Sequence, residues 1–269
     1  MKTRILTGCA LTLFAALILT FSHIPLVLSL ACALLGLLCY YELRATLGYP
    51  GGVFSILCPC LAVGLPFLPT AFFPPILFFL LFLCMAVLST SLMRAAHAKI
   101  TLPKGVILLY LFLPLCLVGV RILREGTQGF YLLCLALFTT AANDTGAYFC
   151  GTYFGRHPLC PVVSPKKTYE GAFGGLICAF ILLGGLALVF TLSGKVVIPS
   201  YFYLTAYIVS ASMVGILGDL CFSAIKRLKG KKDYSTLLPG HGGVLDRIDA
   251  FLFVLPFTVI FNVLCPLFA

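Results

Sequence analysis

Long apolar segments, separated by short polar ones, dominate this chain from end to end. A helix needs about 20 predominantly apolar residues to cross a hydrocarbon core about 30 Å thick. The pattern therefore predicts an all-α fold: a polytopic integral membrane bundle with about nine transmembrane helices. We expect these helices at residues 5–22, 25–43, 52–69, 73–91, 105–122, 129–149, 171–192, 201–222 and 250–268.

Prolines crowd the junction between the third and fourth of these segments, at positions 66, 69, 74 and 75. Proline lacks a backbone N–H and breaks the hydrogen-bond ladder of a helix. The two segments could therefore form a re-entrant pair instead of two full spans, and the boundaries within residues 50–92 are the least certain.

Composition supports a membrane protein, because 61% of the residues are apolar, 10% are charged and the mean hydropathy is +1.13. No stretch is polar enough to form a separate soluble domain. We expect one integral membrane unit, in which residues 1–125 supply N-terminal helices and residues 126–269 supply a C-terminal region whose cytoplasmic loops carry the candidate chemistry. Residues 1–23 resemble a secretory signal, but further spans follow at once, so they are interpreted as the first transmembrane helix.

The distribution of basic residues orients the predicted bundle, since Lys and Arg accumulate in cytoplasmic loops. Placing the N-terminus in the cytoplasm puts fifteen of the 18 basic residues on that side and leaves Arg121, Arg124 and Lys195 on the other. The net charge of +10 then lies along one membrane face, where lipid headgroups and phosphates are the nearest partners. We expect no nucleic-acid partner.

Acidic residues concentrate in the C-terminal half, where six of the eight occur after residue 140. Nine of the 26 charged residues lie between Ser223 and Asp249, in about one tenth of the length. Charge is costly in a membrane protein, so a cluster of it indicates a functional site.

Two predicted hairpins deliver these polar groups to one side of the bundle. They join the sixth helix to the seventh and the eighth to the ninth. The groups at the helix ends are Asn143, Asp144, Lys166, Lys167, Asp219, Asp246, Arg247 and Asp249. Carboxylates favour Mg²⁺, and Lys and Arg favour phosphate. Gly240, Gly242 and Gly243 would let backbone N–H groups approach an anion.

Simpler interpretations remain open for each group. Asp219 could be a solvated helix-end residue, or it could pair with Lys226 or Arg227. Asp246 and Asp249 could complement the dipole of the ninth helix. The two lysines before the seventh helix could form an ordinary basic turn at the membrane surface.

Two blocks of residues together resemble the phosphatidate cytidylyltransferase family, also called CDP-diacylglycerol synthases. The first block comprises Ser223, Lys226, Arg227, Lys232, Asp233, Pro239, His241, Gly242, Gly243, Asp246, Arg247 and Asp249. The second comprises Asn143, Asp144, Thr145, Gly146, Ala147, Tyr148, Ser164, Pro165, Lys166, Lys167, Thr168, Glu170 and Gly171. Tyr169 stands where the family pattern has Trp. The similarity covers roughly residues 139–250, and the N-terminal half resembles the family only in its hydropathy.

The resemblance implies a Mg²⁺-dependent enzyme that converts CTP and phosphatidic acid into CDP-diacylglycerol and pyrophosphate, in phospholipid biosynthesis. We assign the catalytic chemistry to Asp219, Lys226, Arg227, Lys232, His241, Asp246, Arg247 and Asp249. Metal coordination is assigned to Asp219, Asp246, Asp249 and Asp144. Substrate binding is assigned to Asn143, Asp144, Lys166, Lys167, Ser223, Gly242 and Gly243. The expected location is the inner membrane of a bacterial-type cell with the active site facing the cytoplasm, and a homodimer is compatible with such a bundle.

Two rival functions stay open at this point. A CTP-dependent lipid kinase of the polyprenol or phytol kinase type would share CTP use and a multi-helix bundle. A transporter for anionic lipids or nucleotides would also collect charge, although at the midplane of the membrane instead of at one face. The identity of the product separates the transferase from both.

Overall fold

The computed structural model describes residues 2–48, 51–73, 75–98, 108–194, 196–198 and 200–268. Within these ranges the helices are α1 (Lys2–Thr20), α2 (Pro25–Leu47), α3 (Phe54–Gly64), α4 (Pro75–Ala98), α5 (Leu108–Glu125), α6 (Gly129–Phe154), α7 (Tyr169–Leu192), α8 (Tyr201–Leu228) and α9 (Leu245–Leu264). Two 3₁₀ turns, η1 (Leu65–Phe67) and η2 (Thr70–Phe72), follow α3. The strands β1 (Pro158–Cys160) and β2 (Ser164–Thr168) form an antiparallel hairpin. The all-α prediction is thus nearly right, with one small sheet added.

Each predicted apolar segment overlaps a helix within the described residues, but not every helix is a candidate membrane span. Among the described residues, α2, α7, α8 and α9 are long and apolar enough to cross a membrane. The Pro-rich segment at 52–69 is not one continuous helix, because α3 has 11 residues and gives way to 3₁₀ turns at Pro66 and Thr70. At 1.5 Å per residue α3 is about 16 Å long, shorter than the hydrocarbon core. The count of nine spans and the cytoplasmic N-terminus remain predictions.

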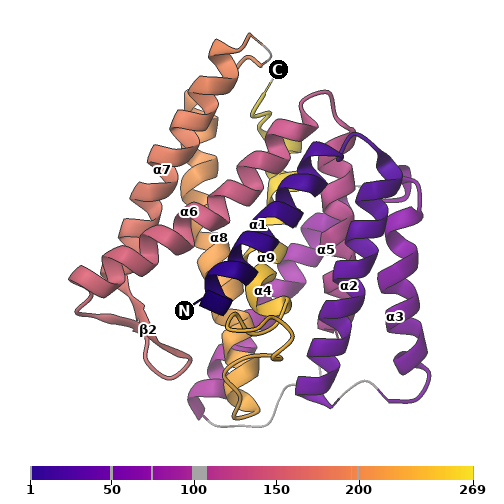
Figure 1. The fold of residues 1–269 in the computed structure, drawn as a ribbon, viewed down its shortest axis with the longest axis vertical. Helices are drawn as coiled ribbons and strands as arrows, with labels where there is room; N and C mark the ends of the chain where they lie inside the picture. Colours follow the sequence, from indigo (N-terminus) through magenta and orange to yellow (C-terminus); the bar gives the residue numbers. More distant parts are fainter. Residues whose placement is uncertain are drawn as a thin grey trace.

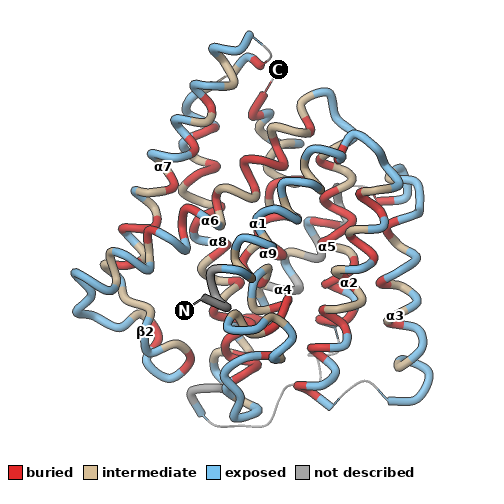
Figure 2. Tube along the Cα trace, in the orientation of Figure 1, coloured by how far each residue is buried: buried red, intermediate tan, exposed pale blue. Residues whose placement is uncertain are grey.

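Helix α9 lies at the centre of the molecule and packs against α2, α4, α5, α6 and α8. Figure 1 shows α8 and α9 between the α6–α7 pair on one side and α2, α3 and α5 on the other. Figure 2 shows the buried residues concentrated in these central helices and the exposed ones on the outer helices. In α7, 22% of the most apolar stretch is buried, against 67% in α8, so α7 presents most of its apolar surface outward.

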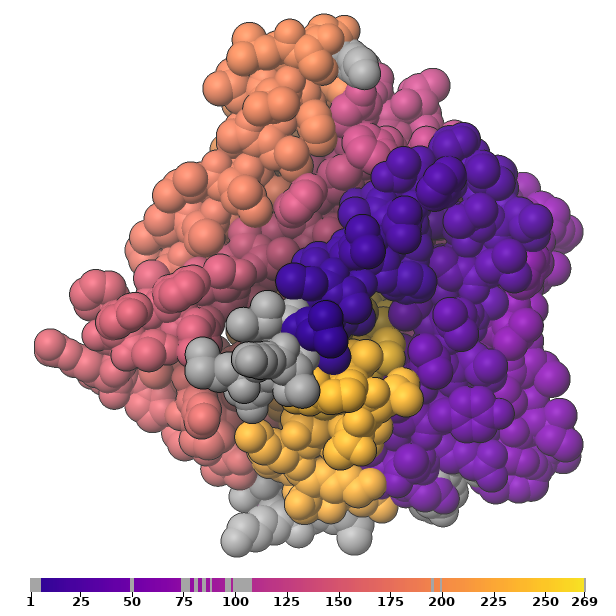
Figure 3. All heavy atoms as spheres, viewed as in Figure 1, coloured from indigo at the N-terminus to yellow at the C-terminus, as the bar shows by residue number. Residues whose placement is uncertain are grey.

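The polar loop at residues 229–244 lies at the same end of the bundle as the start of α1. Thr7 Oγ1 lies 2.7 Å from His241 Nδ1 and donates to the Pro239 carbonyl at 3.1 Å. In the space-filling view the loop fills the surface between α1 and α2 on one side and the α6–α7 hairpin on the other (Figure 3). The first turns of the chain and its most charged loop therefore share one face.

Glycines let α6 and α7 approach closely. A Cβ added to Gly146 of α6 would lie 2.5 Å from Cys178 Cβ and 2.7 Å from the Gly174 carbonyl oxygen of α7. Small residues commonly permit such backbone contact between helices in membranes. The tight pair fixes where α6 presents Asp144 and where α7 begins.

We expect Gly146→Ala to destabilise the protein by about 1–3 kcal/mol, because the added methyl group forces α6 and α7 apart. Thermal unfolding of the detergent-purified protein measures the change. Gly184→Ala on α7 is the matched control, since nothing lies within 4 Å of a Cβ at that position. Equal unfolding temperatures for the two variants would contradict this account of the packing.

Candidate functional site

Three helices extend further at the polar end of the bundle than hydropathy predicts. α6 continues to Phe154, α8 continues to Leu228, and α9 begins at Leu245. The hydropathy criterion ended each helix near its first charged residues, but those residues face a cavity and the helical hydrogen bonds continue past them. Asp144 and Asp219 therefore lie inside helices, which continue beyond them to Phe154 and Leu228.

The segment between α6 and α7, expected to be a loop, contains the β1–β2 hairpin. It presents Lys166 and Lys167 on β2. Thr168 ends the strand and caps α7, because its hydroxyl accepts a hydrogen bond from the Gly171 N–H at 3.1 Å. Arg227 Nε donates to the Val163 carbonyl at 3.1 Å, which ties the hairpin to the end of α8.

One cavity of about 370 Å³, here called the carboxylate cavity, receives side chains from α6, β2, α7, α8, α9 and the loop. Nine of the predicted site residues line it: Asn143, Asp144, Lys166, Lys167, Asp219, Lys226, Asp246, Arg247 and Asp249. Asp233 lines it as well. The prediction that the two polar hairpins converge is confirmed, and Asp219 lies in the same cavity as Asp246 and Asp249.

Ion pairs connect the elements around this cavity. Lys167 of β2 pairs with Asp219 of α8, and Ser223 donates to the same carboxylate at 3.2 Å. Lys226 of α8 pairs with Asp246 of α9 at 2.6 Å. The lining holds five carboxyl groups and four basic side chains, so acidic and basic groups are nearly balanced in number.

Asp246 differs from the other carboxylates because both of its oxygens are occupied. Oδ1 accepts from Lys226 Nζ, and Oδ2 accepts from the backbone N–H groups of Tyr234 and Gly243, each at 2.9 Å. Its side chain is only 3% exposed. This geometry favours a role in holding the loop against α9, and its assignment as a metal ligand stays a prediction.

Three of the other four lining carboxylates, Asp144, Asp219 and Asp249, come from three different helices and face the same space. Across the described ranges, no group of three or more His, Cys, Asp or Glu side chains is arranged so that it could hold a metal ion. A magnesium ion in this cavity would therefore need further oxygens besides these carboxylates, and magnesium usually retains several waters. Asn143 adds a buried side-chain carbonyl oxygen that accepts no hydrogen bond from a described residue, while its amide donates to the Ser212 carbonyl at 3.1 Å.

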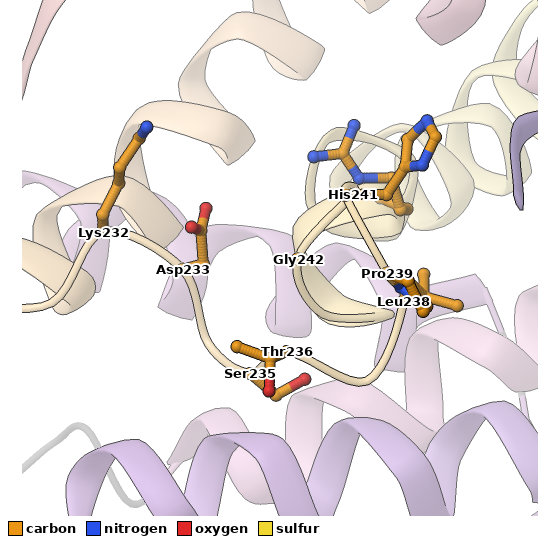
Figure 4. A pocket seen from close by; sticks show the side chains of 10 residues that line it. Lys232, Asp233, Ser235, Thr236, Leu238, Pro239, His241 and Gly242 are labelled. Atoms are coloured by element: carbon orange, nitrogen blue, oxygen red, sulfur yellow. The ribbon is translucent and has the colours of Figure 1, made fainter. Parts of the chain in front are cut away.

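A second cavity of about 580 Å³, here called the loop cavity, is formed by residues 232–242 together with Arg247. Figure 4 shows Lys232, Asp233 and His241 projecting to the same side of the loop. The turn depends on glycine, since Gly240 and Gly242 have φ of 78° and 84°. Three predicted residues of the loop, Lys232, His241 and Gly242, line this cavity.

The expectation that backbone N–H groups of the glycines bind an anion is wrong for two of them. The Gly242 N–H donates to the Leu238 carbonyl at 3.1 Å, and the Gly243 N–H donates to Asp246. These donors close the turn and the start of α9, so they are not available to a ligand. Gly243 lines neither cavity.

Ser223 and Arg227 also line neither cavity. Ser223 is buried and contacts Asp219, so it orients a lining residue. Arg227 donates to Val163 and to the Lys231 carbonyl, so its hydrogen bonds go to the scaffold. The assignment of Ser223 to substrate binding and that of Arg227 to catalysis remain predictions. Neither residue lines a cavity.

Asp233 and Arg247 line both cavities and so lie at their common boundary. Arg247 is exposed and its guanidinium donates no hydrogen bond to a described residue, although it lies close enough to Asp144 to interact electrostatically. Sequence reasoning gave Asp233 no role, although Asp233 belongs to the first of the two blocks that resemble the family.

Tyr234 follows Asp233 in the loop and is buried. Burial raises the pKa of Tyr234 well above its ordinary value, so its hydroxyl stays protonated and donates to the Phe222 carbonyl at 2.9 Å.

The sequence model of the cytidylyltransferase family matches residues 2–265. The phosphatidate cytidylyltransferase of Bacillus subtilis (strain 168) is 43% identical over 134 residues, which cover 50% of this chain and 47% of the relative. Its counterpart in Staphylococcus saprophyticus is 45% identical over 130 residues, or 48% of each chain. That of Staphylococcus epidermidis is 41% identical over 149 residues, or 52% of this chain and 55% of the relative. The chain thus spans about half the length of these curated relatives.

Proposed function

Because this chain belongs to the cytidylyltransferase family, we propose that it transfers the cytidylyl group of CTP to phosphatidic acid, giving CDP-diacylglycerol and pyrophosphate. The names of the curated relatives support this substrate pair. One structural observation carries the proposal. The carboxylate cavity and the loop cavity meet at Asp233 and Arg247, so a nucleotide in one can present its phosphates to a lipid phosphate in the other.

The proposed reaction is a displacement at the α-phosphorus of CTP. A phosphate oxygen of phosphatidic acid forms the new P–O bond, the bond between the α-phosphorus and the bridging oxygen breaks, and pyrophosphate leaves with the electron pair. No general base is required, because a phosphate monoester, with a second pKa of about 6, is already largely dianionic at neutral pH. The main barrier is the repulsion between two anions, which cationic groups must offset.

Arg247 and Lys232 are placed to neutralise the triphosphate. Both are exposed, Lys232 lines the loop cavity, and Arg247 lines both cavities. Lys166 extends from β2 into the carboxylate cavity, where it can meet the lipid phosphate or the nucleotide. Lys167 and Lys226 are already paired with carboxylates, so they contribute charge and also hold those carboxylates in place.

Asp219, Asp249 and Asp144 would hold Mg²⁺. When bound, the ion would neutralise negative charge that develops on the phosphates. The donor chemistry fits, because all three donors are carboxylates, which magnesium favours, and they line one cavity.

We further infer that the bundle lies in the inner membrane of a bacterial-type cell, with its N-terminus and both cavities toward the cytoplasm. Four apolar helices of sufficient length and the fifteen-to-three division of basic residues support this placement. The contact between Thr7 and His241 supports a common side for the N-terminus and the loop. Association into a homodimer remains a prediction.

Pyrophosphate release from CTP by the purified protein tests this function. We expect release that requires both added phosphatidic acid and Mg²⁺, and that is absent with diacylglycerol, which lacks the attacking phosphate. Release of CDP instead of pyrophosphate, without inorganic phosphate, would contradict the proposal and favour a lipid kinase. Release of inorganic phosphate would also contradict it and would indicate hydrolysis of CTP.

A further inference from the structure

A buried glutamate of the N-terminal half reaches into the C-terminal signature loop. Glu42 of α2 is 5% exposed. Its Oε1 accepts from Ser235 Oγ at 2.7 Å and from the Val244 N–H at 2.9 Å, and its Oε2 accepts from the Leu245 N–H at 2.7 Å. These donors stand about 200 positions away along the sequence.

The two backbone donors belong to the first turn of α9, which begins at Leu245. The N-terminus of a helix leaves N–H groups without partners inside the helix and carries a partial positive charge. The residue at the N-cap position, Val244, has no side-chain oxygen, and no capping hydrogen bond forms from it. Glu42 supplies the missing cap from another helix.

Packing at Gly243 fixes this arrangement sterically. A Cβ at position 243 would lie 2.7 Å from Oε2 and 2.8 Å from Oε1 of Glu42. Gly243 is therefore required because a side chain at this position would block the close approach of the Glu42 carboxylate. The sequence had suggested instead that this glycine lets its backbone N–H approach a bound anion.

Two further contacts join the end of α2 to the same loop. Thr46 Oγ1 donates to the Tyr234 carbonyl at 3.4 Å, and Lys231 Nζ donates to the Ala45 carbonyl at 3.0 Å. On the opposite side of the loop, Asp246 accepts from Tyr234 and Gly243. The loop is thus held between two buried carboxylates, one on α2 and one on α9.

We propose that Glu42 is a positioning residue for the reaction, a conclusion that rests on the proposed function. Glu42 lines neither cavity itself, but it fixes the start of α9, two residues before Arg247 and four before Asp249. It also holds Ser235, which lines the loop cavity. Losing the carboxylate would free the loop while leaving the groups that contact substrate intact.

Glu42→Gln tests this proposal with two readouts. The amide keeps the size of the side chain but offers only one acceptor oxygen, so at least one of the three donors loses its partner. We expect kcat/KM for CTP to fall about 30-fold, mostly through KM, because the loop cavity is loosened. We also expect trypsin to cleave about tenfold faster at Lys229, Lys231 and Lys232, which are exposed in the loop.

Glu125→Gln is the matched control, since it removes an acidic group at the other end of the bundle, where Glu125 pairs with Arg121. It should change neither readout by more than about twofold. Glu42→Asp, which retains the charge on a shorter side chain, should recover part of the loss. If Glu42→Gln does not fold, Ser235→Ala decides, with an expected three- to fivefold effect on both readouts.

Unchanged proteolysis and unchanged CTP kinetics in Glu42→Gln would overturn the proposal. Faster proteolysis of Glu42→Gln, together with no cytidylyl transfer even by the wild-type protein, would refute the proposed function. It would still support the inference that Glu42 holds the loop in place. Faster proteolysis with normal CTP kinetics would show that Glu42 is structural only, which also overturns its role in the reaction.

Discussion

Replacing Asp219 with alanine is expected to lower the rate of cytidylyl transfer about 10²- to 10³-fold, the scale seen when a preorganised electrostatic group is removed from an active site. Asp219 lies in the carboxylate cavity beside Asp249, and it forms an ion pair with Lys167. Its loss removes one of the proposed metal ligands. It also leaves the ammonium group of Lys167 without its partner.

The measurement is pyrophosphate release across a Mg²⁺ titration. We expect Asp219→Ala to require a higher Mg²⁺ concentration for half-maximal rate, and Asp219→Asn to show an intermediate defect. Glu125→Ala removes the same charge far from both cavities and should stay within about twofold of the wild type. A variant at position 219 with more than half of the wild-type rate and an unchanged Mg²⁺ dependence would rule out this assignment.

Replacing Arg247 with alanine is expected to lower kcat/KM for CTP about 10²- to 10³-fold. Arg247 lies where the two cavities meet, and its guanidinium donates no hydrogen bond to a described residue, so the guanidinium is available to the phosphates of CTP. A guanidinium offers planar, bidentate donors that an ammonium does not. Arg247→Lys should therefore recover only part of the loss.

Lys229→Ala provides the control for Arg247, because Lys229 is exposed and lines neither cavity. Both substitutions remove one positive charge near the same membrane face. Equal effects from the two would show that general attraction of anions, and not a specific contact, explains the loss. A salt titration distinguishes these cases further, since screening weakens only the long-range effect.

Hydropathy predicted where the helices occur because a bilayer imposes a length and a composition on each segment. It predicted their ends poorly. α6 and α8 continue past their predicted ends at residues 149 and 222, to Phe154 and Leu228, because a polar residue can remain helical where it faces a cavity instead of lipid. The β1–β2 hairpin gave no alternating apolar pattern, since its strands are three and five residues long and contain prolines.

The convergence of the two polar hairpins could be predicted, because both were expected on one side of the membrane. The role of Glu42 could not. It stands in an apolar segment that shares no motif with the C-terminal half, and its partners are backbone N–H groups, which leave no trace in side-chain chemistry. The internal hydrogen bonds of Gly242 and Gly243 were missed for the same reason.

The most direct test of the central claim follows the cytosine ring of CTP into the product. Purified protein is incubated with phosphatidic acid, Mg²⁺ and CTP labelled in the ring, and the lipid fraction is then extracted. The account predicts label in the lipid in equal molar amount to the pyrophosphate released, and its near-complete loss in Asp219→Ala. Label that remains in water-soluble CDP, with only a phosphate group transferred to lipid, would contradict it.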